Sequence, residues 1–233
     1  MLNIIKSSLN ANMRGISLVS NNIANSNTTA FKKSYSNFSD IYSKNISDNP
    51  KGFSGMGVIN DSPRKQMFQG PLKQTNGALD LAVSGLGFLT LASSNNTANK
   101  FYTRDGSLGL SNNGEVVNQQ GLNLLAHPVI GDATYNPDIL EKVIIEPNKT
   151  DTFGNTRILT NINVSSSGVL KAIYGLDEEV VIAKIPLTSF ENMESLQSEG
   201  NNLFTPTTES GEPIVGIALE KNMGEIIPGF LEG

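Results

Sequence analysis

The chain has 233 residues, of which 38% are hydrophobic and 17% charged, with a formal net charge of −5 and no cysteine. This length suits one or two domains, and the composition excludes a highly charged disordered chain, disulfides and metal–thiolate sites. Lys and Arg are scattered along an acidic chain, and no apolar run approaches the ~18 residues of a membrane span. We therefore expect no nucleic-acid partner and no membrane insertion.

Residues 1–30 are expected to form an N-terminal amphipathic helix of the coiled-coil type. Apolar residues recur there at alternating steps of three and four, which is the spacing of a heptad seam. A seam this narrow favours packing against one or two partner helices, whereas an ordinary amphipathic helix that packs on its own domain is the alternative. The seam positions are Leu2, Ile5, Leu9, Asn12, Ile16, Val19 and Ile23.

Residues 31–77 are rich in Ser, Asn, Gly and Lys, and they are expected to form an extended arm. A disordered linker is the alternative. Linkers rarely carry evenly spaced aromatic residues, however, so we expect those of the arm to pack against a partner in the working state of the protein. These aromatic residues are Phe31, Tyr35, Phe38 and Tyr42.

Residues 78–233 consist of short apolar runs with period-two alternation, separated by turn residues. The pair Asn113-Gly114 is the strongest hairpin signal, and the stretch from Glu191 to Gln197 suits a short helical turn. The pattern predicts about ten strands in a β-rich domain of the sandwich or barrel type. The fold class is therefore expected to be mainly β, with one N-terminal helix and an extended arm.

We predict no catalytic, cofactor-binding or metal-binding residues, and hence no enzyme. His127 is the only histidine, which excludes a multi-histidine metal cage, and it is expected at the surface or in a turn beside Pro128. Two carboxylates could in principle form a glycosidase pair, but the chain has no Trp for a sugar cleft. We interpret them as solvated charges and turn caps: Asp80, Asp105, Asp177, Glu178 and Glu179.

The stretch NNIANSNTTAFK, residues 21–32, resembles the signature that closes the N-terminal helix in the bacterial flagellar hook and basal-body rod family. The family usually has Gly at the position of Ala30, so a tight turn is expected to form less easily here. Segments within 68–88, 102–106, 200–211 and 228–233 resemble further blocks of the same family. The residues carried over from the signature are Asn21, Asn22, Ala24, Asn25, Thr28, Phe31 and Lys32.

The resemblance implies a structural subunit of the flagellar axial tube, which self-assembles for torque transmission and motility. In this family, terminal helices pair in an inner coiled-coil layer and a β-rich domain packs outside it. The implied partners are copies of the chain, neighbouring rod and hook subunits, and the flagellar type III export apparatus. The implied location is the hook or basal body of the flagellum, reached without a cleaved signal peptide.

Several alternatives stay open. The segment from Phe38 to Tyr42 resembles a hook subunit more than a rod subunit, so a short hook-type subunit is preferred over a proximal or distal rod protein. The family continues into a second helix where this chain ends at Gly233, so we expect either a truncated sequence or a subunit without that helix. Outside the family, a secreted β-rich adhesin and an enzyme acting on wall glycan are the competing hypotheses.

Overall fold

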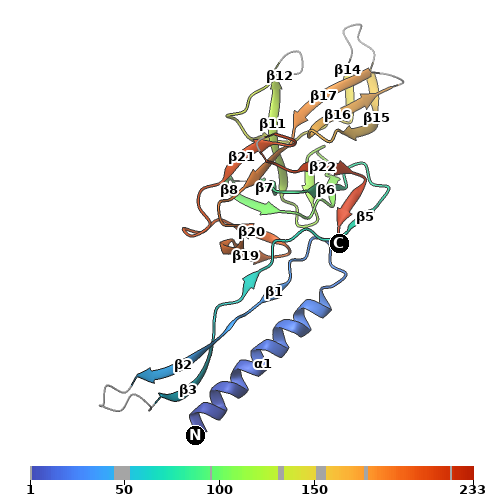
Figure 1. Ribbon diagram of the computed structural model, residues 1–233. Helices are drawn as coiled ribbons and strands as arrows, with labels where there is room; N and C mark the ends of the chain where they lie inside the picture. Colours follow the sequence, from blue (N-terminus) through green and yellow to red (C-terminus); the bar gives the residue numbers. More distant parts are fainter. Residues whose placement is uncertain are drawn as a thin grey trace. The chain divides into compact units, whose positions relative to one another are not determined.

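The computed structural model describes residues 2–44, 53–94, 96–130, 134–150, 156–175, 178–220 and 222–233 (Figure 1). The chain divides into two compact units, Met1–Phe68 and Gln69–Gly233. Strands predominate in the described part, after a single N-terminal helix. The prediction of a mainly β fold with an N-terminal helix is confirmed. The expected helix and most of the expected arm, 31–77, fall in the first unit, and the β-rich region makes up the second.

The first unit consists of helix α1 (Leu2–Ala24) and two antiparallel strand pairs. Strands β2 (Phe38–Lys44) and β3 (Phe53–Asn60) pair with one register shift after Ile41, and β1 (Ser34–Tyr35) pairs with β4 (Arg64–Lys65). The segment expected as an extended arm is therefore built in part as β-ribbon. Ribbon is compatible with its sequence because polar and aromatic residues can alternate on a two-stranded surface.

Small residues let α1 approach β3 closely. Ala11 is 6% exposed, and its carbonyl accepts a hydrogen bond from Asn60 Nδ2 at 3.4 Å. Gly57 has φ +111°, and a Cβ at this position would collide with Ser7 Oγ. A glycine at 57 therefore meets two needs at once, a backbone conformation that other residues rarely adopt and close contact with the helix.

The second unit is built around one large hydrogen-bonded sheet. Its main path runs β14-β15-β16-β17-β11-β7-β8-β20-β19, with β9, β10, β12 and β13 attached beside it. Short two-stranded pairs join β18 to β21, β22 to β6 and β23 to β5. The bounds of the strands up to β12 are β5 Leu72–Gln74, β6 Leu81–Ser84, β7 Leu89–Ser93, β8 Asn96–Thr103, β9 Leu108–Leu110, β10 Val116–Asn118, β11 Asn123–Ile130 and β12 Thr134–Tyr135.

The remaining elements complete the sheet and close the chain. They are β13 Glu141–Lys142, β14 Asn148–Thr150, β15 Thr156–Val164, β16 Val169–Tyr174, β17 Glu178–Lys184, β18 Pro186–Ser189, β19 Gln197–Gly200, β20 Leu203–Thr205, β21 Ile214–Ile217, β22 Glu225–Pro228 and β23 Phe230–Glu232. A 3₁₀ turn at Met193–Ser195 confirms the short helical turn predicted between β18 and β19.

The sheet buries an aliphatic core. Its fully buried members include Leu81, Leu89, Leu91, Leu170 and Ile185, and each contributes roughly 1.5–3 kcal/mol when removed from water. Along β16 the exposure alternates strictly between intermediate and buried, as period two requires. This core lies entirely within the second unit, so that unit has its own basis for stability.

The last strands of the chain return to the first strands of this unit. Strand β22 pairs with β6, with Pro228 opposite Leu81, and β23 pairs with β5, with Glu232 opposite Leu72. In the same region, the amide of Leu81 donates to the carbonyl of Gly106 at 3.0 Å. Parts of the segments 68–88, 102–106 and 228–233, which share the family resemblance, therefore meet in space.

Two expectations about local structure are settled by the sheet. The hairpin predicted at Asn113-Gly114 is confirmed, because it joins β9 to β10 and Gly114 has φ +76°. The described residues from β6 onward form eighteen strands instead of about ten, because short pieces beside turns and register shifts count separately.

The placement expected for His127 was wrong. It lies inside β11, is 2% exposed, and its Nδ1 is 2.8 Å from the carbonyl oxygen of Ile139. The strand continues through Pro128, which lies opposite Ala183. Proline lacks an N–H, but its neighbours still pair here.

The five carboxylates interpreted as solvated charges and turn caps do not gather into one cleft in the described chain. Asp105 accepts hydrogen bonds from Ser107, as a turn residue does. Glu178 faces Lys149 and Arg157, and Glu179 forms an ion pair with Lys171. Asp177 lies outside the described residues.

Candidate assembly interface

The predicted seam lies along one side of α1 and faces water. All six apolar seam residues are large and exposed, from 56% at Val19 to 84% at Leu2. Asn12, the polar member of the seam, is exposed as well. A continuous apolar stripe of this length is uncommon on a chain that works alone, because exposed apolar patches of this kind mark interaction sites. The stripe consists of Leu2, Ile5, Leu9, Ile16, Val19 and Ile23, and we call it the α1 seam.

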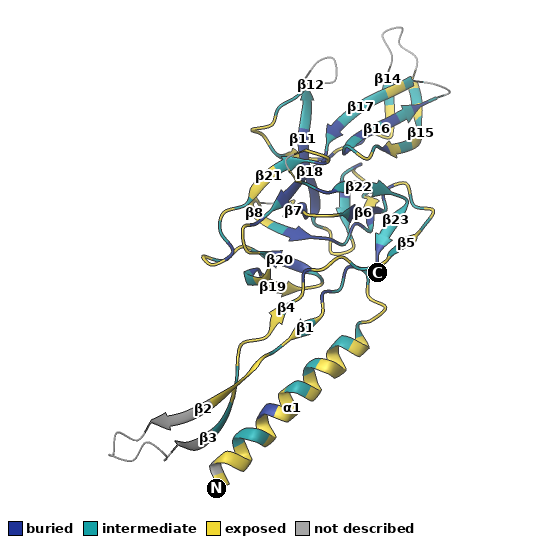
Figure 2. Ribbon diagram, in the orientation of Figure 1, coloured by how far each residue is buried: buried dark blue, intermediate teal, exposed yellow. Residues whose placement is uncertain are grey.

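A different face of α1 contacts the unit's own hairpin. That face carries small or polar residues, among them Ser7, Ala11 and Gly15, which lie roughly opposite the seam on a helix of ~3.6 residues per turn. Ser7 Oγ is 3.5 Å from the amide nitrogen of Val58, which donates to it. The helix therefore uses its weakly apolar face internally and leaves its strongly apolar face available (Figure 2).

The seam borders a hollow. A pocket of about 320 Å³ is lined by Asn12, Gly15, Ile16, Val19, Ser20 and Phe38. Phe38, one of the aromatic residues of the arm, is 53% exposed. The pocket therefore lies between α1 and the start of β2, with two seam residues, Ile16 and Val19, on its wall.

The electrostatics of α1 are simple. Its only charged side chains are Lys6 and Arg14, both exposed, and it carries no acidic residue. The helix therefore carries only positive formal charge, at two positions outside the seam.

The family signature closes the helix onto the ribbon. The side-chain amide of Asn22 forms two hydrogen bonds with the backbone of Ser34, donating to its carbonyl at 2.9 Å and accepting from its amide at 3.0 Å. Asn25 donates to the carbonyl of Asn21 at 3.0 Å and accepts from Thr28 Oγ1 at 3.3 Å. Ala24 is the last helical residue. The Asn-rich signature therefore supplies the polar groups that end α1 and turn the chain into β1.

The remaining residues of the signature contact the chain at strand β4 and just after it. Lys32 is 3% exposed, and its Nζ donates to the carbonyl oxygen of Phe68 at 2.8 Å. Lys65 Nζ lies 5.1 Å from the ring centre of Phe31, a cation–π contact. Ala30, which precedes Phe31, has φ +56°, a backbone conformation that favours the glycine usual in the family.

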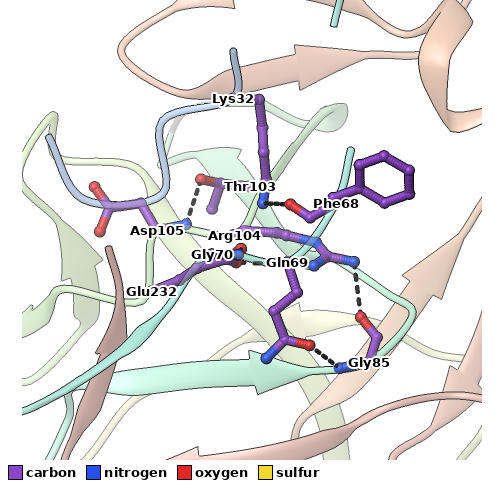
Figure 3. Close-up of polar contacts among 9 residues, drawn as sticks. All are labelled: Lys32, Phe68, Gln69, Gly70, Gly85, Thr103, Arg104, Asp105 and Glu232. Atoms are coloured by element: carbon purple, nitrogen blue, oxygen red, sulfur yellow. Dashed lines mark hydrogen bonds and ion pairs between the residues drawn. The ribbon is translucent and has the colours of Figure 1, made fainter. Parts of the chain in front are cut away.

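A second polar cluster lies within the second unit, at the end of the chain (Figure 3). Arg104 is 1% exposed, and its Nη2 donates to the carbonyl of Gly85 at 2.8 Å. Its Nη1 lies 3.8 Å from Oε2 of the fully buried Glu232. Glu232 Oε1 also accepts a hydrogen bond from the amide of Gly70 at 2.6 Å.

Burial lowers the pKa of the Arg104 guanidinium, and the nearby Glu232 carboxylate opposes this shift. The guanidinium also lies 5.2 Å from the ring centre of Phe88. The cluster holds β23, the final strand, against the start of the unit. We interpret this cluster as structural, because its polar groups contact the backbone and each other.

Reasoning from sequence missed two sets of residues that shape these sites. Arg104 and Glu232 stood within the resembling blocks, but no role was assigned to them, because their partners are far away in sequence. The close packing of Ser7 on Gly57 was missed as well. The one available signal was a glycine inside an otherwise extended run, which indicates close backbone approach.

Within the described residues, three or more potential metal-ligating side chains do not gather at one place. Over the same part of the chain, no helix combines the length and the apolar character needed to cross a membrane.

Comparison with known proteins shows which protein family the chain resembles. A family model for the flagellar hook protein FlgE/F/G D1 domain matches residues 82–172, which span β6 through most of β16. By this model and by the relatives below, the chain is similar to flagellar hook and rod proteins.

The relatives are rod and hook proteins by name. The chain is 29% identical over 241 residues to the flagellar basal-body rod protein FlgG of Buchnera aphidicola subsp. Acyrthosiphon pisum, an alignment covering 98% of this chain and 82% of the relative. FlgG of Borreliella burgdorferi is also 29% identical, over 238 residues, covering 97% and 80%. The flagellar hook protein FlgE of Escherichia coli is 34% identical over 125 residues, covering 54% of this chain and 29% of the relative.

Proposed function

We propose that this chain is a non-enzymatic structural subunit of the bacterial flagellar axial tube, and that the α1 seam is its main contact with neighbouring subunits. The observation that carries the proposal is the exposure of all six apolar seam residues on a helix whose other face is already occupied. Burial of each such side chain is worth roughly 1.5–3 kcal/mol, so the seam provides a strong drive to associate. Similarity to rod and hook proteins is the reason for proposing the flagellar axial tube as the assembly.

Within the tube, we propose a rod position over a hook position. The alignments to FlgG proteins run along nearly the whole chain, whereas the alignment to the hook protein covers about half of it. The resemblance of 38–42 to a hook subunit is short by comparison. The proposed partners are copies of this chain, other rod and hook subunits, and the type III export apparatus. The proposed location is the flagellum, reached without cleavage of a signal peptide.

The test changes the seam without changing the fold. Replacing Leu9 and Ile16 with Asp places two carboxylates in the seam, and we expect the variant to lose self-assembly and motility. The melting temperature of the second unit should stay nearly unchanged, because its core contains no residue of α1. Sedimentation, electron microscopy and a swimming assay provide the readouts.

A matched control carries the same chemistry on another face of the helix. Asn10→Asp with Ser17→Asp adds two carboxylates at the same seven-residue spacing, at exposed positions outside the seam. This control should assemble and swim. Equal loss in both variants, or normal assembly of the Leu9→Asp/Ile16→Asp variant, would contradict the proposal.

A further inference from the structure

The two units of the chain carry opposite net charge. Met1–Phe68 contains eight Lys and Arg against three Asp and Glu, for a formal net charge of +5. Gln69–Gly233 contains nine Lys and Arg against nineteen Asp and Glu, for a formal net charge of −10. Two copies of the chain are therefore complementary when the first unit of one meets the second unit of the other.

The acidic unit displays an open strand edge. Strand β21 pairs with β18 along one side, with Ile217 opposite Pro186, and no other strand of the described chain pairs with it. Ile214 and Val215 are 55% and 41% exposed. Because successive residues of a strand point to opposite faces, their joint exposure leaves both faces of β21 open at this end (Figure 2). Unpaired edges with apolar side chains are sites where another chain can add.

The turn after β21 adds a third apolar side chain. Leu219 has φ +70°, which is uncommon for a residue other than glycine, and its side chain is 58% exposed. Two backbone hydrogen bonds hold the described part of the turn, because the Leu219 amide donates to the carbonyl of Gly224 and the Glu220 amide to that of Ile217. A large apolar side chain is thus exposed to water beside the strand edge. We call Ile214, Val215 and Leu219 together the β21 edge.

Two carboxylates flank this edge, and the one cationic residue beside them, Lys221, lies outside the described residues. Glu212 precedes β21 and Glu220 follows its turn, and both are exposed. The first unit offers the opposite sign on its β1–β4 ribbon. Arg64 lies opposite Tyr35 in this ribbon, and the backbone amide of Gln66 donates to the carbonyl of Lys33. The side chains of Lys33 and Arg64 are both exposed.

We propose that the β21 edge docks the basic first unit of a second copy of this chain, with Glu212 and Glu220 facing its β1–β4 ribbon. The proposal rests on the proposed function as a self-assembling subunit and adds a second contact to it, distinct from the α1 seam. The contact is heterologous, since different surfaces of the two copies meet, and such contacts repeat into an open polymer. A polyanionic partner is disfavoured at this edge because it would be repelled by the acidic unit.

Charge reversal tests the contact in the full chain. One variant carries Glu212→Lys and Glu220→Lys, and the other carries Lys33→Glu and Arg64→Glu, which leaves the α1 seam intact. Each variant alone should raise the concentration at which half of the chain is assembled by about tenfold or more. An equal mixture of the two should restore assembly to within about twofold of the wild type, because each then finds its complement on the other. Sedimentation measures both quantities.

Two controls distinguish an effect of charge at the β21 edge from an effect of the net charge of the chain. Asp138→Lys with Glu141→Lys makes the same change in net charge at exposed positions elsewhere on the second unit, and it should assemble as the wild type does. Wild-type assembly should also slow as salt rises from 0.1 M to 1 M, since the screening length falls from ~10 Å to ~3 Å. If a Lys variant shows a lowered melting temperature, Glu212→Gln with Glu220→Gln replaces it.

The outcomes are distinct. Restored assembly in the mixture supports docking between copies. Restoration only when all four changes are in one chain would mean a contact within a chain, and it would overturn the proposal. Normal assembly of the Glu212→Lys/Glu220→Lys variant overturns it too, while leaving the proposed function intact. Wild-type protein that never assembles would remove the proposed function itself.

Discussion

At the level of single residues, the pair Arg104 and Glu232 has the largest expected effect on stability. Replacing Arg104 with Met removes the guanidinium that lies 3.8 Å from the buried Glu232 carboxylate, and we expect a loss of roughly 3–5 kcal/mol in the free energy of unfolding. Urea unfolding measures it. The double variant Arg104→Met/Glu232→Gln should lose less than the sum of the single changes, because the carboxylate is then gone.

A surface pair provides the comparison for this prediction. Arg157 lies 3.2 Å from Glu178, and its side chain is 41% exposed. Arg157→Met should therefore cost no more than about 1 kcal/mol. Similar costs at Arg104 and Arg157 would show that the buried pair does not hold the final strand.

Residue roles were predictable only where their partners are local. The hairpin at Asn113-Gly114 depends on its own two residues, and the seam depends on spacing within one helix. Glu232 acts on Gly70, 162 residues away, so no local pattern indicates it. His127 was misplaced for a similar reason, since its burial comes from strands that are distant in sequence.

At the level of elements, the junction between α1 and β1 depends on one side-chain amide. Asn22 matches both backbone groups of Ser34 much as a neighbouring strand would. Asn22→Ala should leave those two groups without this partner and cost about 1–3 kcal/mol locally. Hydrogen exchange should then show faster exchange at Ser34 and in the last turn of α1.

Asn21 supplies the matched control for this junction. It belongs to the same signature and is exposed, one position earlier on the helix. Asn21→Ala should leave exchange at Ser34 unchanged. Equal acceleration in both variants would indicate loss of helix propensity instead of loss of the junction.

The sequence predicts α1 well, because a heptad pattern depends on one element alone. The pairing of its seam with other helices stays a prediction. The sequence does not predict which face of the helix contacts the hairpin. That choice depends on close approach at Gly57, where a side chain would collide with Ser7. The contact is therefore a property of two elements, and only the structure reveals that the seam remains exposed.

At the level of the whole molecule, composition and turn spacing are sufficient to predict a mainly β chain with one N-terminal helix. The order of strands in the large sheet was beyond prediction, because it joins β20 to β8 and β11 to β17 across long intervals of sequence. The division into a basic and an acidic unit needs both the sequence and the fold. The charges are read from the sequence, but the boundary at Phe68 is known only from the fold.

The central claim is that subunits assemble through the α1 seam, and the absence of cysteine from the chain makes a direct test possible. A single thiol introduced by Ile16→Cys reports on the seam, and Ser17→Cys reports on an adjacent exposed position outside it. The rate of maleimide labelling is measured for each in the monomer and in the assembled state. We predict that assembly slows labelling at position 16 by about tenfold or more, and slows it much less at position 17, because the seam is desolvated by its partner. A thiol at position 16 that reacts equally fast in both states would contradict the account.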